Sequence, residues 1–439
     1  MSRPDPDPSP DPDRASAHVP DVPAELDGRD GSAVAAVAGA GAGAARLPDR
    51  ALLALLAATA ALGSIALHMF TPVLPAARDA FGVPHPVAQL ALSLPLLAMA
   101  PATLAYGPIA DRLGRRPALL VSLVLFLAGT VTALLAPGIG WLVGGRVVQA
   151  VGAVGGIVLA RTVASDRFPA ERLAQTLATL TMVMVLAPLV APLAGGLIGD
   201  LVGWRAIFVV QLAYAVLLAV VAGARLPETM PVRAAGGEAS SVLADMRVIA
   251  AERRFRSYAL QSAFATAAFM TFVAATPAVF VDMLGHGSAE FGKYFALVAG
   301  GYMIGNFIAV KSSARTGRHR MVVAGAACAL AAASVALGLV LSGFRTEWTI
   351  VGPTVLMTLS IGVSHPNAQA AAIGVFPRKA GTAAGGVTFL QNVAAALAVQ
   401  VVGLFPTTSM LPMAVAMVGF TLAALLSLTA LRRPSAPRA

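Results

Sequence analysis

Long apolar runs constrain this chain more than any other feature of its sequence. A helix that crosses the hydrocarbon core of a bilayer needs roughly 20 apolar residues, and twelve runs of about that length follow one another between residues 51 and 431. Hydrophobic residues make up 57% of the chain and charged residues only 12%, whereas soluble domains average about 25% charged residues. We therefore expect an all-α membrane protein with twelve transmembrane helices.

The runs fall into two blocks of equal length. Six lie in residues 50–225 and six in 257–432, which predicts two pseudo-symmetric six-helix lobes with a substrate site near the membrane midplane between them. Residues 226–256 are expected to form a cytoplasmic linker with a short amphipathic helix. The Pro- and Asp-rich residues 1–48 are expected to be a disordered cytoplasmic tail, and 433–439 a second tail.

The net charge of +10 indicates how the chain lies in a membrane. If both termini are cytoplasmic, most Arg and Lys residues beyond residue 50 fall in inside loops. The outside loops then hold only Arg78, Arg205, Lys293 and Arg345. Such an asymmetry sets the orientation of a multi-pass protein. The alternative, a nucleic-acid site, is disfavoured because the charges are scattered over short loops without interleaved aromatic residues.

The loop between the second and third runs reads GPIADRLGRRP. Topology alone can explain it, since basic residues hold a loop inside and glycine permits a tight turn. The stretch also closely resembles the helix 2–3 loop of major facilitator superfamily transporters. That resemblance implies a conformational latch made by Gly107, Asp111, Arg112, Gly114, Arg115 and Arg116.

Within this latch, Asp111 is expected to accept hydrogen bonds from a helix N-terminus of the other lobe, where the helix dipole favours an anion. Arg112 and Arg116 are expected to pair with acids near the cytoplasmic face, such as Asp166 or Glu171.

The fourth run carries polar and small residues at helical spacing, namely Arg146, Gln149, Gly152 and Gly155. An arginine inside a membrane helix is expensive and is a functional candidate for that reason; the alternative is that its side chain snorkels to the lipid headgroups. The run resembles a second superfamily signature, whose arginine is linked to proton coupling in drug antiporters. Ala150 departs from that signature, which usually has glycine there.

The fifth run contains helix-bending and small residues, namely Pro188, Pro192, Gly195 and Gly196. The abundance of Pro and Gly in membrane helices generally is the simpler explanation. The segment also resembles the antiporter signature in the variant typical of bicyclomycin/chloramphenicol-resistance (Bcr/CflA) exporters. Its expected packing partner is a small-residue face with Gly301 and Gly305 in the eighth run.

Further segments similar to Bcr/CflA exporters occur in order, including MFTPVLP, VLARTVASD, LPET and HPNAQAAAIGVFPRKAGTAAG. The resemblance covers most of residues 51–400. It implies the major facilitator fold and a proton-coupled exporter of antibiotics or other drugs, working by alternating access in the bacterial inner membrane.

The first run departs from that subfamily, because His68 stands where an aspartate is usual. All twelve acidic residues beyond residue 50 fall at helix ends, in loops or in the linker. His68 is therefore the natural candidate for proton exchange, with Arg146 at similar depth as a partner. The alternative is a neutral His68 that bonds a backbone carbonyl. His365, before a proline, is expected to serve a helix kink.

The substrate cavity is expected to be apolar with a few hydrogen-bonding groups, and an arginine without a membrane carboxylate favours neutral, zwitterionic or anionic amphiphiles over lipophilic cations. Two other functions stay open: a facilitator that imports a small metabolite, and a membrane sensor that binds a ligand without moving it. The candidate cavity residues are Phe70, Gln89, Phe264, Phe269, Phe272, Tyr302, Asn306, Phe389, Gln391 and Asn392.

No catalytic, metal or cofactor chemistry is expected. The single cysteine, Cys328, excludes an intrachain disulfide and a thiol–metal cluster, and we expect it in the core. The GSAEFGKY segment matches phosphate-loop spacing except at Tyr294, and no strand precedes it, so transport driven by ATP is not expected. The expected partners are a small drug-like molecule, protons and the lipid bilayer, and the chain is expected to be a monomer.

Overall fold

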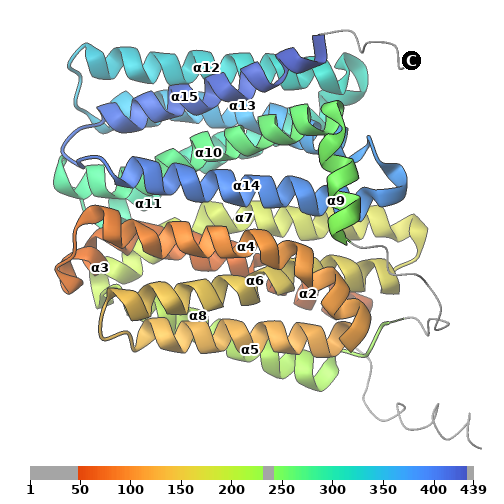
Figure 1. Cartoon of the computed structure of the whole chain (residues 1–439). Helices are drawn as coiled ribbons and strands as arrows, with labels where there is room; N and C mark the ends of the chain where they lie inside the picture. Colours follow the sequence, from red (N-terminus) through yellow and green to blue (C-terminus); the bar gives the residue numbers. More distant parts are fainter. Residues whose placement is uncertain (1–47, 231–241, 433–439) are drawn as a thin grey trace, which may run out of the picture. The chain divides into compact units, whose positions relative to one another are not determined.

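The structure, a computed structural model, describes residues 48–230 and 242–432 (Figure 1). The predicted tails, apart from Pro48, and residues 231–241 of the predicted linker lie outside the described residues. In the part that is described, all regular structure is helical. The long helices are α2 (Asp49–Phe70), α4 (His85–Leu113), α5 (Arg115–Leu134), α6 (Ile139–Arg167), α7 (Ala170–Val202), α8 (Ala206–Arg225), α10 (Arg253–Asp282), α11 (Ser288–Thr316), α12 (Arg318–Leu341), α13 (Glu347–Ile373), α14 (Ala380–Gly403) and α15 (Leu411–Ser427).

Several short helices connect or flank these: η1 (Thr71–Val73), α3 (Leu74–Phe81), α9 (Val242–Ala251), η2 (Pro377–Lys379) and η3 (Thr429–Arg432). Helix α9 confirms the short helix expected in the linker. It packs on α10 and α14, and Asp245 of α9 forms an ion pair of 2.7 Å with Lys379.

Within the described residues, 10 helices are long and apolar enough to cross a membrane. They include the continuous stretch Asp49–Phe81, which joins α2, η1 and α3. The two remaining long helices are α13, whose SHPN segment and two prolines make it more polar, and α15, which has 17 residues. The predicted twelve helices are all present, although two of them fall short of the length or hydropathy of a typical span.

The helices pack as two lobes (Figure 1). Helices α2 and α4–α8 pack on one another, and so do α10–α15. Contact between the lobes runs mainly along two pairs, α4 with α14 and α7 with α11. This is the two-lobed, all-helical architecture expected from the sequence.

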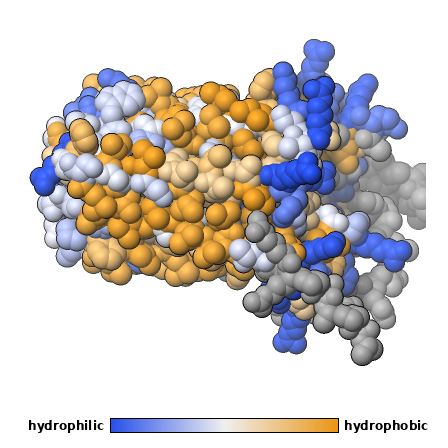
Figure 2. Space-filling model, turned by 90° about the horizontal axis from the view of Figure 1, so that it is seen from above, coloured by the Kyte–Doolittle hydropathy of each residue, from blue (hydrophilic) through white to orange (hydrophobic). Residues whose placement is uncertain are grey.

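The connections alternate between two ends of the bundle. The basic end, where α9 lies at the right of Figure 1, holds the turns after α4, α6, α8, α11 and α13; the far end, where α3 lies, holds the others. Figure 2 shows an apolar belt along the bundle and strongly hydrophilic side chains gathered at the basic end. The chain is a multi-span membrane protein.

Cys328 on α12 is exposed, so the expectation of a core cysteine is wrong. The apolar side chain of Val335 on the same helix is also exposed, because in a membrane helix the face turned to lipid can be as apolar as the core.

Candidate functional site: a cavity between the lobes

A cavity of about 330 Å³ lies between the two lobes. Three helices of each lobe contribute to its wall. The lining residues are His68, Arg161, Thr181, Met184, Val185 and Pro188 from α2, α6 and α7, and Thr266, Phe269, Met270, Ala299, Tyr302, Asn306, Ile361, His365, Pro366 and Gln369 from α10, α11 and α13.

The cavity extends from the basic end deep into the bundle. At 1.5 Å per residue, Arg161 lies roughly 9 Å from the basic end of α6, and His68 lies roughly 28 Å from the basic end of α2. Arg161 and Thr181 are exposed, whereas His68, Met270 and Ile361 at greater depth are buried. This gradient of exposure places the mouth of the cavity toward the basic end.

His68 lines the deep part of this cavity. Its Nδ1 lies 2.8 Å from the backbone oxygen of Ser64, so in the neutral ring Nδ1 carries the proton and donates it. Its Nε2 is buried and has no hydrogen-bond partner. The bond to a backbone carbonyl that one alternative predicted is therefore present, and in the neutral ring it leaves Nε2 as an acceptor without a partner.

A polar network lies behind the wall formed by the second lobe. The amide nitrogen of Gln391 donates to Ser262 Oγ at 2.7 Å and lies 3.0 Å from His365 Nε2. In this orientation Nε2 accepts, so Nδ1 donates to the hydroxyl of Tyr302 at 3.3 Å. The Tyr302 hydroxyl then keeps its own proton for a molecule in the cavity. His365 is thus part of the cavity wall rather than only a residue at a kink.

Three of the ten candidate cavity residues line the cavity, namely Phe269, Tyr302 and Asn306. Gln391 contacts it through His365. The others lie elsewhere: Phe70, Gln89 and Phe272 are fully buried in helix packing, and Phe264, Phe389 and Asn392 are outside the lining set.

Arg146 is completely enclosed in the first lobe, with 2% of its surface exposed. Its Nη1 donates to Ala66 O at 3.0 Å and to Gln149 Oε1 at 2.6 Å, and its guanidinium lies over the Phe70 ring. The Gln149 amide continues to Thr130 at 2.8 Å. Snorkelling to the headgroups is therefore wrong for Arg146, which instead ties α6 to the backbone of α2.

Arg146 and His68 share a depth but not a contact. Arg146 bonds the carbonyl of Ala66, whereas His68, two residues farther along α2, is one of the residues that line the cavity. Two residues along a helix correspond to about 200° of rotation, so the two groups use different faces of α2. The structure does not join them as a relay.

The glycines of the fourth and fifth runs permit close helix packing. A Cβ at Gly152 would overlap the backbone of α5, and one at Gly155 would overlap Ser122 and Tyr106. A Cβ at Gly195 would overlap Met69 O of α2, and one at Gly196 would overlap Ser288 O of α11.

The expected partner of the α7 glycines is corrected. Gly301 and Gly305 pack against α13, at Val355 and Leu359, and α7 instead meets the first turns of α11, around Ser288 and Gly292. The contact between α7 and α11 that is made at the α7 glycines lies at the far end, whereas Gly301 and Gly305 lie farther along α11 on the side that packs against α13.

Two acidic residues join the lobes at the far end. Asp282 at the end of α10 accepts two hydrogen bonds from Arg78 of α3, at 2.7 and 2.9 Å. Asp200 of α7 accepts from the backbone N–H groups of Ser288 and Ala289, at 3.2 and 2.8 Å, and so caps the N-terminus of α11 in the other lobe.

Deeper in the same half, Gln89 donates to Ala274 O at 2.9 Å, and Ser93 donates to Gln400 Oε1 at 2.7 Å. In residues 48–230 and 242–432, every direct hydrogen bond and ion pair that we find between the lobes lies in this half of the bundle. The far end is therefore closed, and the cavity faces the basic end.

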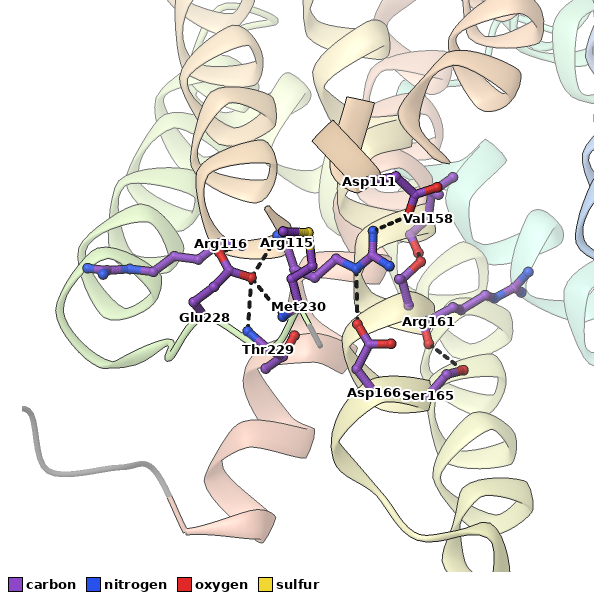
Figure 3. Close-up of polar contacts among 11 residues, drawn as sticks. Asp111, Arg115, Arg116, Val158, Arg161, Ser165, Asp166, Glu228, Thr229 and Met230 are labelled. Carbon is purple, nitrogen blue, oxygen red and sulfur yellow. Dashed lines mark hydrogen bonds and ion pairs between the residues drawn. The ribbon is translucent and has the colours of Figure 1, made fainter. Parts of the chain in front are cut away.

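The α4–α5 turn is an ion-pair cluster inside the first lobe (Figure 3). Arg115 Nη1 donates to Asp111 at 2.7 Å and its Nε to Asp166 at 3.0 Å. The expected pairing of Arg112 or Arg116 with Asp166 is wrong, because Arg115 makes it and Arg116 donates to Gly223 O at 2.7 Å. Asp111 is bound within its own lobe in this conformation, so the expected contact with the other lobe is not made here.

Glu228, which follows α8, caps the start of α5. Its carboxylate accepts from the backbone N–H groups of Arg115 at 2.9 Å and Arg116 at 3.2 Å, and from those of Thr229 and Met230 (Figure 3). Burial alone would raise the pKa of Glu228, but these four backbone donors lower it below its ordinary value. Gly114, with φ +94°, supplies the turn, and a Cβ there would collide with the Glu228 carboxylate.

A protein-family model described as Major Facilitator Superfamily matches residues 32–399. The chain belongs to the major facilitator superfamily.

Several relatives carry names of drug-resistance proteins. Multidrug resistance protein D of Escherichia coli (strain K12) is 27% identical over 357 residues, which cover 81% of this chain and 89% of that protein. MdtL of Salmonella typhimurium, named a multidrug resistance protein, is 27% identical over 221 residues, covering 50% of this chain and 55% of that one. The "Uncharacterized MFS-type transporter YdgK" of Bacillus subtilis is 27% identical over 265 residues, covering 58% of this chain and 66% of YdgK.

The match thus spans less than two thirds of YdgK and about half of MdtL, but most of multidrug resistance protein D.

Solved structures agree on the fold. A bacterial homologue of the human lysosomal transporter Spinster has a TM-score of 0.67 at 18% identity, covering 87% of this chain and 94% of that one. A D-xylose–proton symporter has a TM-score of 0.68 at 13% identity, covering 86% and 95%.

The major facilitator fold was correctly predicted, whereas much of the cavity was not. Arg161, Thr181, Met184 and Gln369 were missed as lining residues. Arg161 lies in the VLARTVASD segment, whose similarity to Bcr/CflA exporters does not by itself indicate a cavity residue; the signal that could have singled it out is a charged residue two turns inside a membrane helix.

Proposed function

We propose that this chain is an exporter of small amphiphilic compounds that works by alternating access in the bacterial inner membrane and is coupled to protons. In this proposal the basic end and both termini are cytoplasmic, and the chain acts as a monomer. The Bcr/CflA type of drug antiporter is the subfamily we expect. The drug-resistance names of the relatives support export, and the excess of basic residues at one end supports the orientation.

One observation carries the proposal: a cavity between two lobes that are tied together at the far end only. Such an arrangement is the inward-facing half of an alternating cycle. In the other half, the far-end contacts of Asp282 and Asp200 release, and the lobes close at the basic end. Asp111, in the last turn of α4, then reaches the N-terminus of α14 as Asp200 now reaches that of α11.

His68 is the proposed coupling residue. Its Nε2 is buried without a partner while Nδ1 remains bonded to Ser64 O. A proton can therefore bind to Nε2 without breaking a hydrogen bond, and the resulting charge belongs to a residue that lines the substrate cavity. Proton and substrate then bind to the same cavity, so each changes the affinity for the other, which is the condition for coupled transport.

The test is proton flux in liposomes that contain the purified protein and a pH-sensitive dye. With a pH gradient imposed, we expect a panel of antibiotics to include compounds that release protons through the wild-type protein. His68→Ala abolishes that flux, whereas His286→Gln, a change at the far-end loop, leaves it intact.

Compound movement without proton flux would instead mean a facilitator, as the absence of any Asp or Glu from the cavity lining described above allows. Specific binding without any movement would favour a sensor.

A further inference from the structure

Arg161 is the one permanently charged side chain that lines the cavity described here, and its charge has no carboxylate partner among the ion pairs of the described residues. The acid nearest along its own helix, Asp166, is already bound by Arg115 at 3.0 Å. Figure 3 shows the Arg161 side chain pointing away from that cluster. Its guanidinium instead reaches the sulfur of Met184 across the cavity wall, at 3.9 Å.

A thioether is a weak acceptor and leaves the donors of a guanidinium largely unused. Arg161 is exposed, so its charge is accessible from the cavity. A planar guanidinium with several free N–H groups suits a carboxylate, a sulfonate or a phosphate, each of which it can bind through two parallel hydrogen bonds.

The other residues of the cavity wall indicate what the rest of a bound ligand should look like. Beyond Arg161 and its neighbour Met184, the wall includes the apolar side chains of Phe269, Met270 and Ile361. The Tyr302 hydroxyl offers a donor, and His68 lines the same wall with its Nε2 buried and without a hydrogen-bond partner. The axial distance between the levels of Arg161 and His68 is on the order of 20 Å by helix rise, which suits an elongated molecule rather than a small ion.

We propose that the cavity takes anionic amphiphiles, with the anionic group bound by Arg161 nearer the mouth and an apolar or aromatic body inserted between the lobes. That such molecules are transported rests on the proposed function. The binding preference itself depends only on the cavity.

Matched dansyl probes separate charge from shape: dansylglycine carries a carboxylate, dansylglycinamide is its neutral counterpart, and dansylcadaverine is a cation. Binding is measured by equilibrium dialysis with the whole protein in lipid nanodiscs, and binding to empty nanodiscs is subtracted. We expect the wild-type protein to bind dansylglycine roughly tenfold more tightly than dansylglycinamide, as one charged hydrogen-bonded contact provides, and dansylcadaverine most weakly.

Arg161→Gln removes the preference for the carboxylate and leaves dansylglycinamide binding within about twofold of wild type. Arg161→Lys retains part of the preference, and Arg172→Gln, which removes a basic residue outside the cavity lining, retains all of it. Equal binding of the carboxylate and the amide by wild-type protein overturns the inference without need of any variant. So does an equal loss in Arg161→Gln and Arg172→Gln.

Transport assays of the same probes distinguish this inference from the exporter proposal. Movement of dansylglycinamide without any preference for dansylglycine refutes the anion site and leaves the exporter. An Arg161-dependent preference in binding, without movement of any probe in liposomes, refutes the exporter and leaves the anion site.

Discussion

Two arginines inside the first lobe show how surroundings decide what a charge does. Arg146 is enclosed: its guanidinium donates hydrogen bonds to Ala66 O and Gln149 and lies over the face of the Phe70 ring. Arg161 lines the cavity with a thioether as its neighbour. The first charge holds helices together, and the second is available to a ligand.

Replacement of Arg146 by lysine tests its structural role. An ammonium group has neither the planar face that lies over Phe70 nor the Nε–H group that points to Ala91 O at 3.5 Å, so we expect Arg146→Lys to destabilise the protein by about 2 kcal/mol. Unfolding in detergent measures the change, with Arg172→Lys as the control at an exposed position. Equal stability of the two variants would contradict the role assigned to Arg146.

At the scale of a single element, the start of α5 depends on an acid from outside the helix. Four backbone N–H groups bind the Glu228 carboxylate and lower its pKa. A carboxyl whose pKa is lower in the folded than in the unfolded protein stabilises the fold above its ordinary pKa, and this contribution is lost as the pH falls through the lowered value.

Glu228→Gln is therefore expected to reduce stability by about 1 kcal/mol at neutral pH, as loss of a helix-capping acid does. The difference from wild type should begin to shrink as the pH is lowered below 4.5, the ordinary pKa of the group, because the unfolded wild-type chain then takes up a proton at Glu228. It should be lost below the lowered pKa, where the carboxyl of the folded protein is neutral as well. Thermal unfolding at pH 7.5 and near pH 4 measures both. A difference that stays constant with pH would show that the charge of Glu228 is not what stabilises the turn.

The elements themselves were largely predictable, because run length and hydropathy report directly on membrane helices. The sides that those helices turn to one another were not. The pattern of small residues at Gly301 and Gly305 identified a close contact but assigned it to α7 rather than α13. From the sequence, Phe70 and Phe272 are as plausible cavity residues as Phe269. In a membrane protein, the hydrophobicity of a residue does not show whether it packs between helices or lines a cavity.

At the scale of the whole molecule, the two lobes are tied by few polar contacts at one end. The pair formed by Arg78 and Asp282 is bidentate, and Thr407 adds a third hydrogen bond to Asp282 at 2.6 Å. Arg78 also bonds Asp79 at 2.8 Å, but that contact stays within α3.

Asp282→Asn is expected to shift the population toward a far-end-open conformation by roughly fivefold, from about 1 kcal/mol of lost interaction. Asp79→Asn removes a carboxylate from the same arginine and should leave the population unchanged. Distances between spin labels at positions 140 and 342, one in each lobe, measure the opening in a Cys328→Ser background. Equal effects of the two substitutions would mean that Arg78 and Asp282 do not hold the far end closed.

The hydrogen bonds from Ser288 and Ala289 to Asp200 have one more consequence. Both donors are main-chain groups, which every residue except proline possesses. Substitutions at the two partner positions therefore leave this closure intact, while a change of Asp200 removes it. Across a family of such sequences, the acid would be constrained with no co-varying partner, and a search for correlated substitutions would overlook one of the contacts that closes the transporter.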